Sequence, residues 1–304
     1  MEIIEVNIKE KKKREPCYLA IGFFDGFHKG HELLLQEIEK GKGAKKALLT
    51  FTRSFKSSLK KEKEELLLTK EETVEYCEKE GIDILYVLPF NEETWKASVN
   101  DFLSFLKSLN PREIVVGEDF TFAYKAEGNV KTLEKLQEDG IEVKALPLLS
   151  LHGEKVASRS IKEHLHNKQV ALAKEELGYP FFYTGKVLHG YQNGQKLGFP
   201  TANLLLPQGK VRLPDGVYYT RTLVDGKLYS SMTNIGSHPT IDELPIDIAE
   251  TNIFGLKEDL YGKTIRVYFL DYLRDQKKFS SLEELRSQLA KDKIECLKKE
   301  GSTK

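Results

Sequence analysis

The spacing of apolar residues changes character once along this chain of 304 residues, near residues 178–180. Before that point, short apolar runs that indicate buried strands alternate with segments whose spacing indicates helices. This alternation is typical of crossover units, in which helices cover both faces of a parallel sheet. Beyond it, short strands separated by turns indicate an antiparallel sandwich or barrel. The sequence therefore predicts two domains, an α/β domain at residues 1–180 and a β-barrel domain at residues 181–304.

The individual elements can be assigned from the same spacing. A capping-box pattern, Ser280 with Glu283, predicts the start of a last helix over 281–297 that closes the barrel,. Asp225-Gly226 predicts a tight hairpin turn. The strands expected in the first domain are 17–21, 47–51, 82–88, 113–117 and 141–146, with helices at 32–38, 101–107, 130–138 and from 158 to 176. The strands expected in the second domain are 182–188, 201–206, 216–223, 227–233, 248–254 and 264–270.

A turn rich in glycine and histidine, residues 22–31 (GFFDGFHKGH), joins the first strand to its helix. Backbone N–H groups at a helix N-terminus attract phosphate, and glycines let a ligand approach the backbone. His28 and His31 are three residues apart and can face one anion. Ligands of parallel sheets bind at the carboxyl ends of strands, where this turn lies. The turn predicts a nucleotide phosphate site; a plain turn or a metal site are the alternatives, but no third metal ligand is evident.

Two further polar segments of the first domain have open interpretations. Residues 117–122 (GEDFTF) follow the fourth strand, and their two aromatic rings can stack on a planar ligand or cover the sheet edge,. Residues 158–162 (SRSIK) begin a helical pattern. Their two hydroxyls and two cations suit a triphosphate, whereas the alternative is a serine N-cap with a solvated cationic first turn.

The second domain carries its own group of polar residues. Residues 190–203 place three glycines before Pro-Thr-Ala-Asn. Glycines can wrap phosphates, and the oxygens of Thr201 and Asn203 suit Mg²⁺; a long connecting loop is the alternative. Glu250 lies between apolar neighbours, where it either takes a proton from a substrate hydroxyl or faces solvent. Arg274 is either an anchor or a surface charge.

Composition excludes several classes of partner. Lys plus Arg and Asp plus Glu both number 47, so no net charge recruits nucleic acid or an anionic membrane,. No apolar run is long enough to span a bilayer. Cys17, Cys77 and Cys296 are far apart in the sequence, which indicates no disulfide framework and a reducing cytoplasm,. Small-molecule substrates are therefore expected, and the oligomeric state is left open up to a weak homo-oligomer.

Taken in order, these motifs resemble those of the prokaryotic bifunctional riboflavin kinase/FMN adenylyltransferase family, or FAD synthetase. Residues 22–31 are similar to its G-x-F-D-G-x-H-x-G-H signature, and residues 197–203 (LGFPTAN) to its kinase signature. The resemblance covers nearly the whole chain. It implies a nucleotidyltransferase-type, Rossmann-like parallel-sheet domain followed by a six-stranded antiparallel β-barrel with a C-terminal helix. The other similar segments are 214–218, 234–236 with 239–240, 259–262, and 273–274 with 278–279.

The resemblance implies two ATP-dependent reactions with Mg²⁺: riboflavin becomes FMN in the second domain, and FMN becomes FAD in the first. Glu250 matches the general base of the kinase, and His28 and His31 match residues that stabilise charge on the transferred phosphoryl group. The implied adenylyltransferase residues are Gly22, Phe23, Phe24, Asp25, Gly30, Ser158, Arg159 and Lys162 for ATP, and Asp119, Phe120 and Phe122 for the flavin. Those of the kinase are Gly190, Gly198, Pro200, Thr201 and Asn203 for ATP, the last two also for Mg²⁺, and Arg274 for the flavin.

Three single positions and one segment depart from the family pattern. Lys162 replaces an arginine, Ala123 replaces a glycine, and Asn252 replaces the histidine of E-x-H; residues 50–55 (TFTRSF) replace T-F-x-P-H-P. A bifunctional enzyme is the first hypothesis. A riboflavin kinase with weak or lost adenylyltransferase activity is the second, and a non-catalytic flavin-binding regulator or RNA-binding protein is the third.

Overall fold

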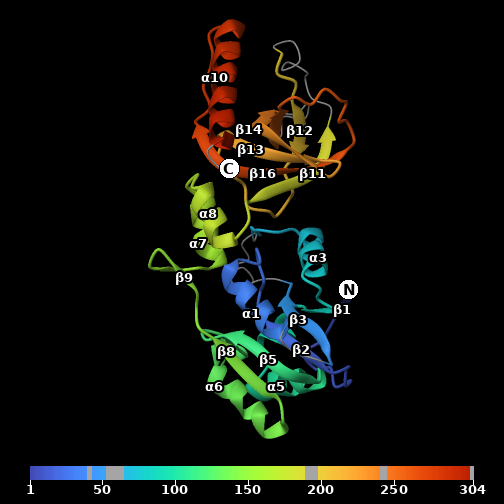
Figure 1. Ribbon diagram of the computed structural model, residues 1–304. Coiled ribbons are helices and arrows are strands. Elements are labelled where there is room, and N and C mark those ends of the chain that lie inside the picture. The colour runs from blue at the N-terminus through green and yellow to red at the C-terminus, as the bar shows by residue number, and fades with distance from the viewer. Residues whose placement is uncertain (40–42, 53–64, 189–197, 240–244, 302–304) are drawn as a thin grey trace. The chain divides into compact units, whose positions relative to one another are not determined.

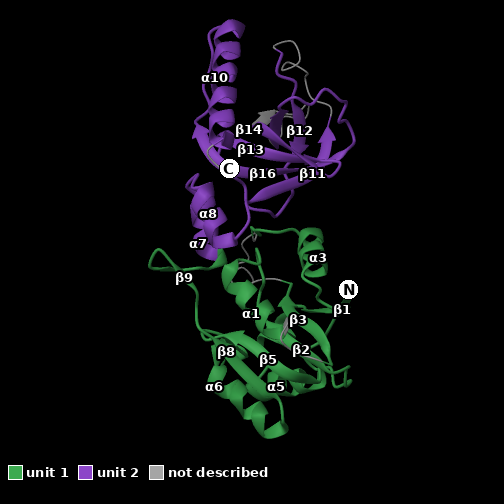
Figure 2. Cartoon of the chain, viewed as in Figure 1, with its two compact units in different colours: residues 1–158 green, residues 159–304 purple. Residues whose placement is uncertain are grey.

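A computed structural model describes residues 1–39, 43–52, 65–188, 198–239 and 245–301 (Figure 1). The chain forms two compact units, Met1–Ser158 and Arg159–Lys304 (Figure 2). Some predicted features lie outside the described residues: Gly190 and Gly194 of the glycine-rich segment, Thr240, and the departure at residues 53–55.

The first unit is built on a six-stranded parallel sheet. The chain passes from β2 to its neighbour β3 and on to β4 beyond it, and then returns across the sheet to β5 on the other side of β2. This reversal makes the gap between the carboxyl ends of β2 and β5 a topological switch point, where α/β proteins bind ligands. The strands in spatial order are β1 (Glu2–Glu5), β4 (Ile84–Leu88), β3 (Lys45–Phe51), β2 (Cys17–Ile21), β5 (Pro111–Gly117) and β8 (Glu142–Leu146).

The helices of this unit begin where side chains satisfy their first N–H groups. Capping boxes start α3 (Lys70–Lys79) at Thr69 and α5 (Val99–Ser108) at Ser98,. Helix α1 (Lys29–Glu39) packs on β2 and β5. The α/β architecture is confirmed, but the helix expected over 130–138 is divided into α6 (Val130–Leu133) and the 3₁₀ helix η2 (Glu134–Asp139).

Several elements of the first unit were not predicted. They are β1, α3, α4 (Glu92–Trp95), and two short hairpins formed by β6 (Thr121–Phe122) with β7 (Gly128–Asn129) and by β9 (Ser150–Leu151) with β10 (Glu154–Lys155).

The second unit begins with α7 (Ser158–His166, of which Ser158 belongs to the first unit) and α8 (Val170–Leu177), and continues into a closed antiparallel barrel. The predicted Asp225-Gly226 hairpin turn is confirmed, because both residues have positive φ between the paired Val224 and Lys227. The barrel strands in spatial order are β11 (Phe182–Leu188), β12 (Ala202–Leu205), β15 (Pro245–Ile253), β14 (Lys227–Pro239), β13 (Gly216–Val224) and β16 (Thr264–Arg274).

Hydroxyl groups form a chain among the buried side chains of the barrel. Adjacent members are 2.8–2.9 Å apart, and none of them is exposed. Buried hydroxyls must be paired, and here they pair with one another. The members in order are Thr222, Ser231, Thr220, Thr233 and Thr251.

The last helix, α10 (Leu282–Gly301), packs on β14 of the barrel. The predicted capping box at Ser280 and Glu283 is wrong by one residue. Ser281 Oγ accepts a hydrogen bond from the Glu284 N–H, and the Glu284 carboxylate accepts one from the Ser280 N–H. Two consecutive serines are each followed by a glutamate three residues later, so the sequence pattern fits both registers.

Candidate active sites

The glycine- and histidine-rich turn after β2 is held in place by contacts with distant segments. Thr50 Oγ1 donates a hydrogen bond to the Phe23 carbonyl at 3.0 Å, and Ser158 Oγ donates one to the Asp25 carbonyl at 2.8 Å. The Asp25 carboxylate accepts a 2.7 Å hydrogen bond from the Leu67 N–H. Asp25 therefore positions backbone, while Phe24 is buried against the His31 ring.

The two histidines of this turn lie face to face. Their ring centroids are 3.7 Å apart, and Gly30 makes room because a Cβ there would lie 3.2 Å from the His28 ring. The Nδ1 atoms of His28 and His31 are buried and have no hydrogen-bond partner among the described residues. Burial lowers the pKa of His28 to about 4, helped by the charge of Lys155, and burial also lowers the pKa of His31. Both rings are therefore neutral at neutral pH.

A cavity of about 240 Å³ opens beside the two histidines. It brings together residues that follow β2, residues that follow β5 and the end of the β9–β10 hairpin, as expected at a topological switch point. Lys155 on β10, which the sequence analysis missed, lines it and forms an ion pair with Asp119. Seven predicted site residues line this cavity: Gly22, His28, Gly30, His31, Asp119, Phe120 and Ser158.

A second cavity of the first unit, of about 320 Å³, is lined mostly by aromatic rings. Phe122 stacks on Phe102 at 4.7 Å, and a Cβ at Gly128 would lie 2.5 Å from the Phe122 ring, so only glycine fits there. Gly22 and Phe120 line both cavities, which therefore adjoin. Predicted residues in its wall are Gly22, Phe23, Phe120 and Phe122, and those the sequence analysis missed include Phe51, Phe90, Trp95 and Phe102.

Two predicted ATP-binding cations lie on α7, in the second unit. Arg159 Nε is 2.9 Å from Glu163 Oε1, and both side chains are largely exposed. Lys162 follows one helical turn later. The structure of each unit by itself does not bring Arg159 or Lys162 to the histidine cavity, so their role stays a prediction.

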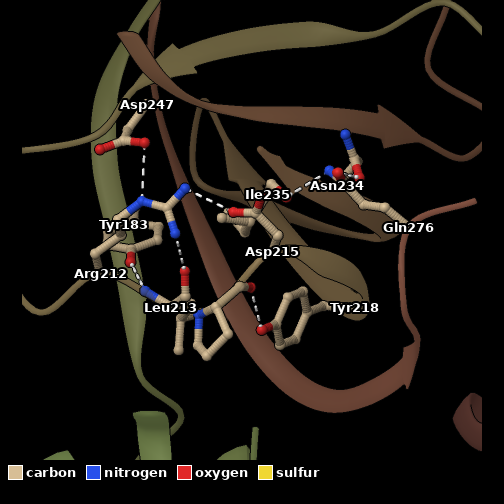
Figure 3. Close-up of polar contacts among 10 residues, drawn as sticks. Tyr183, Arg212, Leu213, Asp215, Tyr218, Asn234, Ile235, Asp247 and Gln276 are labelled. Atoms are coloured by element: carbon tan, nitrogen blue, oxygen red, sulfur yellow. Dashed lines mark hydrogen bonds and ion pairs between the residues drawn. The ribbon is translucent and has the colours of Figure 1, made fainter. Parts of the chain in front are cut away.

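In the second unit, the pairing of three strands places two predicted site residues, Asn203 and Glu250, in one row with Asn234. Glu250 on β15 lies directly opposite Asn203 on β12 and Asn234 on β14. Directly opposed residues project from the same face of a sheet, so the three side chains are neighbours. Gln276 Nε2 extends the row, because it donates to Asn234 Oδ1 at 3.0 Å and to the Ile235 carbonyl at 2.8 Å (Figure 3).

The segment that leads into β13 is fixed to the barrel by a polar network (Figure 3). The Arg212 guanidinium lies 2.8 Å from Asp247 on β15 and 2.6 Å from Asp215. Tyr183 OH accepts a hydrogen bond from the Leu213 N–H at 2.9 Å, and Tyr218 OH donates one to the Pro214 carbonyl at 2.6 Å. Asp247 precedes Glu250 by three residues, so this network also steadies the strand that carries Glu250.

A cavity of about 670 Å³ lies on the opposite side of strands β12 and β15 from this row. Ala202 and Thr251, a directly opposed pair, line it together with Pro200 and Thr201. Neighbouring residues of a strand point to opposite faces, so Asn203 and Glu250 face away from it. The segment 200–203 therefore forms the boundary between the cavity and the row of polar side chains. Gly198, with φ of 79°, turns the chain into this segment.

Arg274, predicted on the flavin side of the kinase, is engaged by α10. Its guanidinium Nε and a terminal nitrogen bind the buried Asp292 carboxylate at 2.7–3.1 Å. Arg274 therefore ties the end of β16 to the last helix.

Comparison with known families matches each half of the chain to a separate enzyme. Residues 10–160 match the FAD synthetase family, and residues 177–299 match the riboflavin kinase family. The fold and its sites are thus those of a two-module enzyme of flavin cofactor synthesis. The chain belongs to the bifunctional riboflavin kinase/FMN adenylyltransferase family, which confirms the family that its motifs predicted.

Relatives align along nearly the whole chain. The bifunctional riboflavin kinase/FMN adenylyltransferase of Bacillus subtilis (strain 168) is 32% identical over 300 residues, covering 95% of this chain and 94% of the relative. That of Escherichia coli (strain K12) is also 32% identical, covering 96% and 95%. A crystal structure described as a macrolide-efflux protein from Streptococcus pneumoniae is 30% identical, with a TM-score of 0.87 over 97% of this chain and 98% of that one. In the described part of this chain, no helix combines the length and apolarity needed to cross a bilayer.

Proposed function

We propose that the first unit joins ATP to FMN at the boundary between its two cavities, and that the second unit makes FMN from riboflavin and ATP. The adjoining of a polar and an aromatic cavity at Gly22 and Phe120 is the observation that carries the first assignment. The aromatic cavity suits the flavin ring, and the histidine cavity suits the triphosphate. The phosphate of FMN then meets the α-phosphate of ATP where the cavities adjoin.

In the adenylyl transfer, an oxygen of the FMN phosphate attacks the α-phosphorus of ATP and pyrophosphate leaves. His28 and His31 donate hydrogen bonds from neutral rings to the charge that develops on the phosphoryl oxygens. The N-terminus of α1 and the Lys155 ammonium add positive potential. Ser158 and Asp25 hold the turn, and Asp119 holds Lys155. We also keep Arg159 and Lys162 as proposed ATP-binding cations, which rest on sequence alone.

In the phosphoryl transfer, Glu250 takes the proton of the ribityl hydroxyl of riboflavin while the oxygen attacks the γ-phosphorus and ADP leaves. The cavity beside Thr201 takes the nucleotide, and the opposite face, with Asn203, Glu250 and Asn234, takes the riboflavin hydroxyl. We keep Thr201 and Asn203 as the proposed Mg²⁺ ligands because the hydroxyl and amide oxygens are hard donors of the kind that Mg²⁺ prefers. When bound, the ion would neutralise phosphate charge.

The remaining proposals concern the domain boundaries, Arg274, the cellular compartment and the partners. We place the domains at residues 1–180 and 181–304, and the family matches at 10–160 and 177–299 support one activity in each. Arg274 would serve the flavin side by holding α10 against β16. The three cysteines are free and buried, which supports the expected reducing cytoplasm,. Small molecules are the proposed partners, with no more than weak self-association.

Product analysis with two variants tests the proposal. The protein is incubated with riboflavin, ATP and Mg²⁺, and the flavins are separated by chromatography. FAD is expected; FMN alone would identify a kinase with a lost adenylyltransferase, and unchanged riboflavin a non-catalytic flavin-binding protein. Glu250→Ala should stop FMN formation but leave FAD formation from supplied FMN, and His28→Ala should do the reverse. Loss of both reactions in either folded variant would contradict the two-site assignment.

A further inference from the structure

Asn252 makes a hydrogen bond to the segment that separates the two faces of the proposed kinase site. Its Nδ2 donates to the carbonyl of Pro200 at 2.6 Å, and Asn252 is only 6% exposed. Asn252 lies on β15 two residues after Glu250, so both side chains project from the same face of the strand,. One strand therefore carries the proposed base and a group that holds the neighbouring segment.

The hydrogen bond fixes the orientation of the peptide group between Pro200 and Thr201. In a trans peptide, the carbonyl and the following N–H point in opposite directions, and the structure has no cis peptide among its described residues,. Because Asn252 holds the Pro200 carbonyl on its own face of β15, the Thr201 N–H is turned the other way, toward the cavity that Thr201 lines.

The neighbouring residue Phe199 is anchored on the same side. Phe199 packs on a buried cluster that contains Met232, and Met232 lies directly opposite Asn252. The apolar contact fixes the approach of the chain, and the Asn252 hydrogen bond holds the peptide group that follows.

We infer that Asn252 is a positioning residue for nucleotide binding in the kinase unit, acting through the Pro200–Thr201 peptide. It presents the Thr201 N–H and hydroxyl to the phosphates of ATP in a fixed arrangement. This inference rests on the proposed placement of the nucleotide beside Thr201. Asparagine can do this because its amide donates to a carbonyl; a histidine N–H at the same position can also donate, whereas an aspartate of the same shape cannot.

Steady-state kinetics of three variants test the inference. Asn252→Asp keeps the shape but places a carboxylate against the Pro200 carbonyl, so KM for MgATP in riboflavin phosphorylation should rise about ten-fold. KM for riboflavin should stay within about two-fold. Asn252→His should recover most of the loss. FAD formation from FMN, measured on the same samples, should be unchanged and serves as an internal control of folding and concentration.

Titration calorimetry with MgADP supplies a readout independent of turnover: one of two nucleotide sites should weaken in Asn252→Asp while the other stays. A uniform rise of both KM values, or wild-type kinetics in Asn252→Asp, would overturn the inference. Thr201→Val separates this from the proposed function. If Thr201→Val phosphorylates riboflavin normally, the nucleotide placement itself is wrong; if it is impaired while Asn252→Asp is normal, only the role of Asn252 fails.

Discussion

The rings of His28 and His31 stack with an interplanar angle of 18°, and the Nδ1 atom of each ring is buried. Two imidazolium ions could not share this position without strong repulsion, and burial already disfavours one. The pair is thus kept neutral, and in the proposed reaction its rings act as hydrogen-bond donors to the phosphate.

Acid should destabilise the first unit through this pair. The unfolded chain protonates its histidines below about pH 6.5, whereas the folded unit resists protonation of His28 until about pH 4. The stability that neutral His28 contributes is therefore fully present above the unfolded pKa, and it is lost as the pH falls toward the folded pKa of about 4,. We expect the free energy of unfolding to fall by about 2 kcal/mol from His28 between about pH 7 and about pH 5. Urea denaturation at both pH values measures this.

The control is the exposed His152 of the same unit. His28→Gln should reduce the pH dependence of unfolding by the contribution of His28 while that of His31 remains, and His152→Gln should leave it as in the wild type. An equal effect of the two substitutions would show that the buried pair is not the source.

Trp95 should report occupation of the aromatic cavity. It is the only tryptophan of the chain and lines that cavity, so its fluorescence should be quenched when FMN binds. Phe122→Ala removes a ring that stacks on Phe102 and should raise the dissociation constant for FMN about ten-fold. Trp95→Phe should abolish the signal. Unquenched Trp95 at FMN concentrations that saturate FAD formation would place the flavin elsewhere.

Lys155 should matter for adenylyl transfer alone. Lys155→Met removes a cation from the histidine cavity, and we expect KM for ATP in FAD formation to rise about ten-fold. Lys155→Arg keeps the charge and should stay near the wild type, while riboflavin phosphorylation should be unaffected by either change. A wild-type KM in Lys155→Met would remove this residue from the site.

Ala123, where the family has glycine, is held in a strained conformation. Its φ is 65° and its ψ is −179°, a region that side chains other than glycine rarely occupy,. Ala123→Gly should therefore stabilise the first unit by about 1 kcal/mol, since relief of strain exceeds the entropy cost of glycine. Ala97→Gly, at a buried position without positive φ, should destabilise it. Thermal unfolding of both variants decides the sign.

Features formed by residues close together in the sequence could be predicted. Features formed by residues that only the fold brings together could not. The turn at residues 22–31 has its glycines and histidines in one short segment between a strand and a helix, so the sequence alone predicted a phosphate-binding turn there, and the structure places this turn beside a cavity. The aromatic cavity draws Phe51, Phe90, Trp95 and Phe102 from four separate segments. No local pattern marks them as members of one wall.

The register in which strands pair was the second feature that the sequence alone could not predict. The opposition of Asn203 and Glu250 depends on how β12 pairs with β15, which spacing within either strand does not specify. The short strand β1 was missed because it is largely exposed at the sheet edge and shows no apolar run. Lys155 was missed because a single lysine in a hairpin acquires meaning only from the histidines that the fold brings near it.

The shared wall of the two cavities has a consequence for the product. FAD contains both the flavin and the adenylyl group, so under the proposed placement it would occupy the aromatic and the histidine cavity at once, with its two phosphates beside Gly22 and Phe120. A product bound in this way would block the entry of either substrate. We therefore expect turnover of the first unit to be limited by the release of FAD, and accumulated FAD to inhibit its own synthesis by competing with both FMN and ATP.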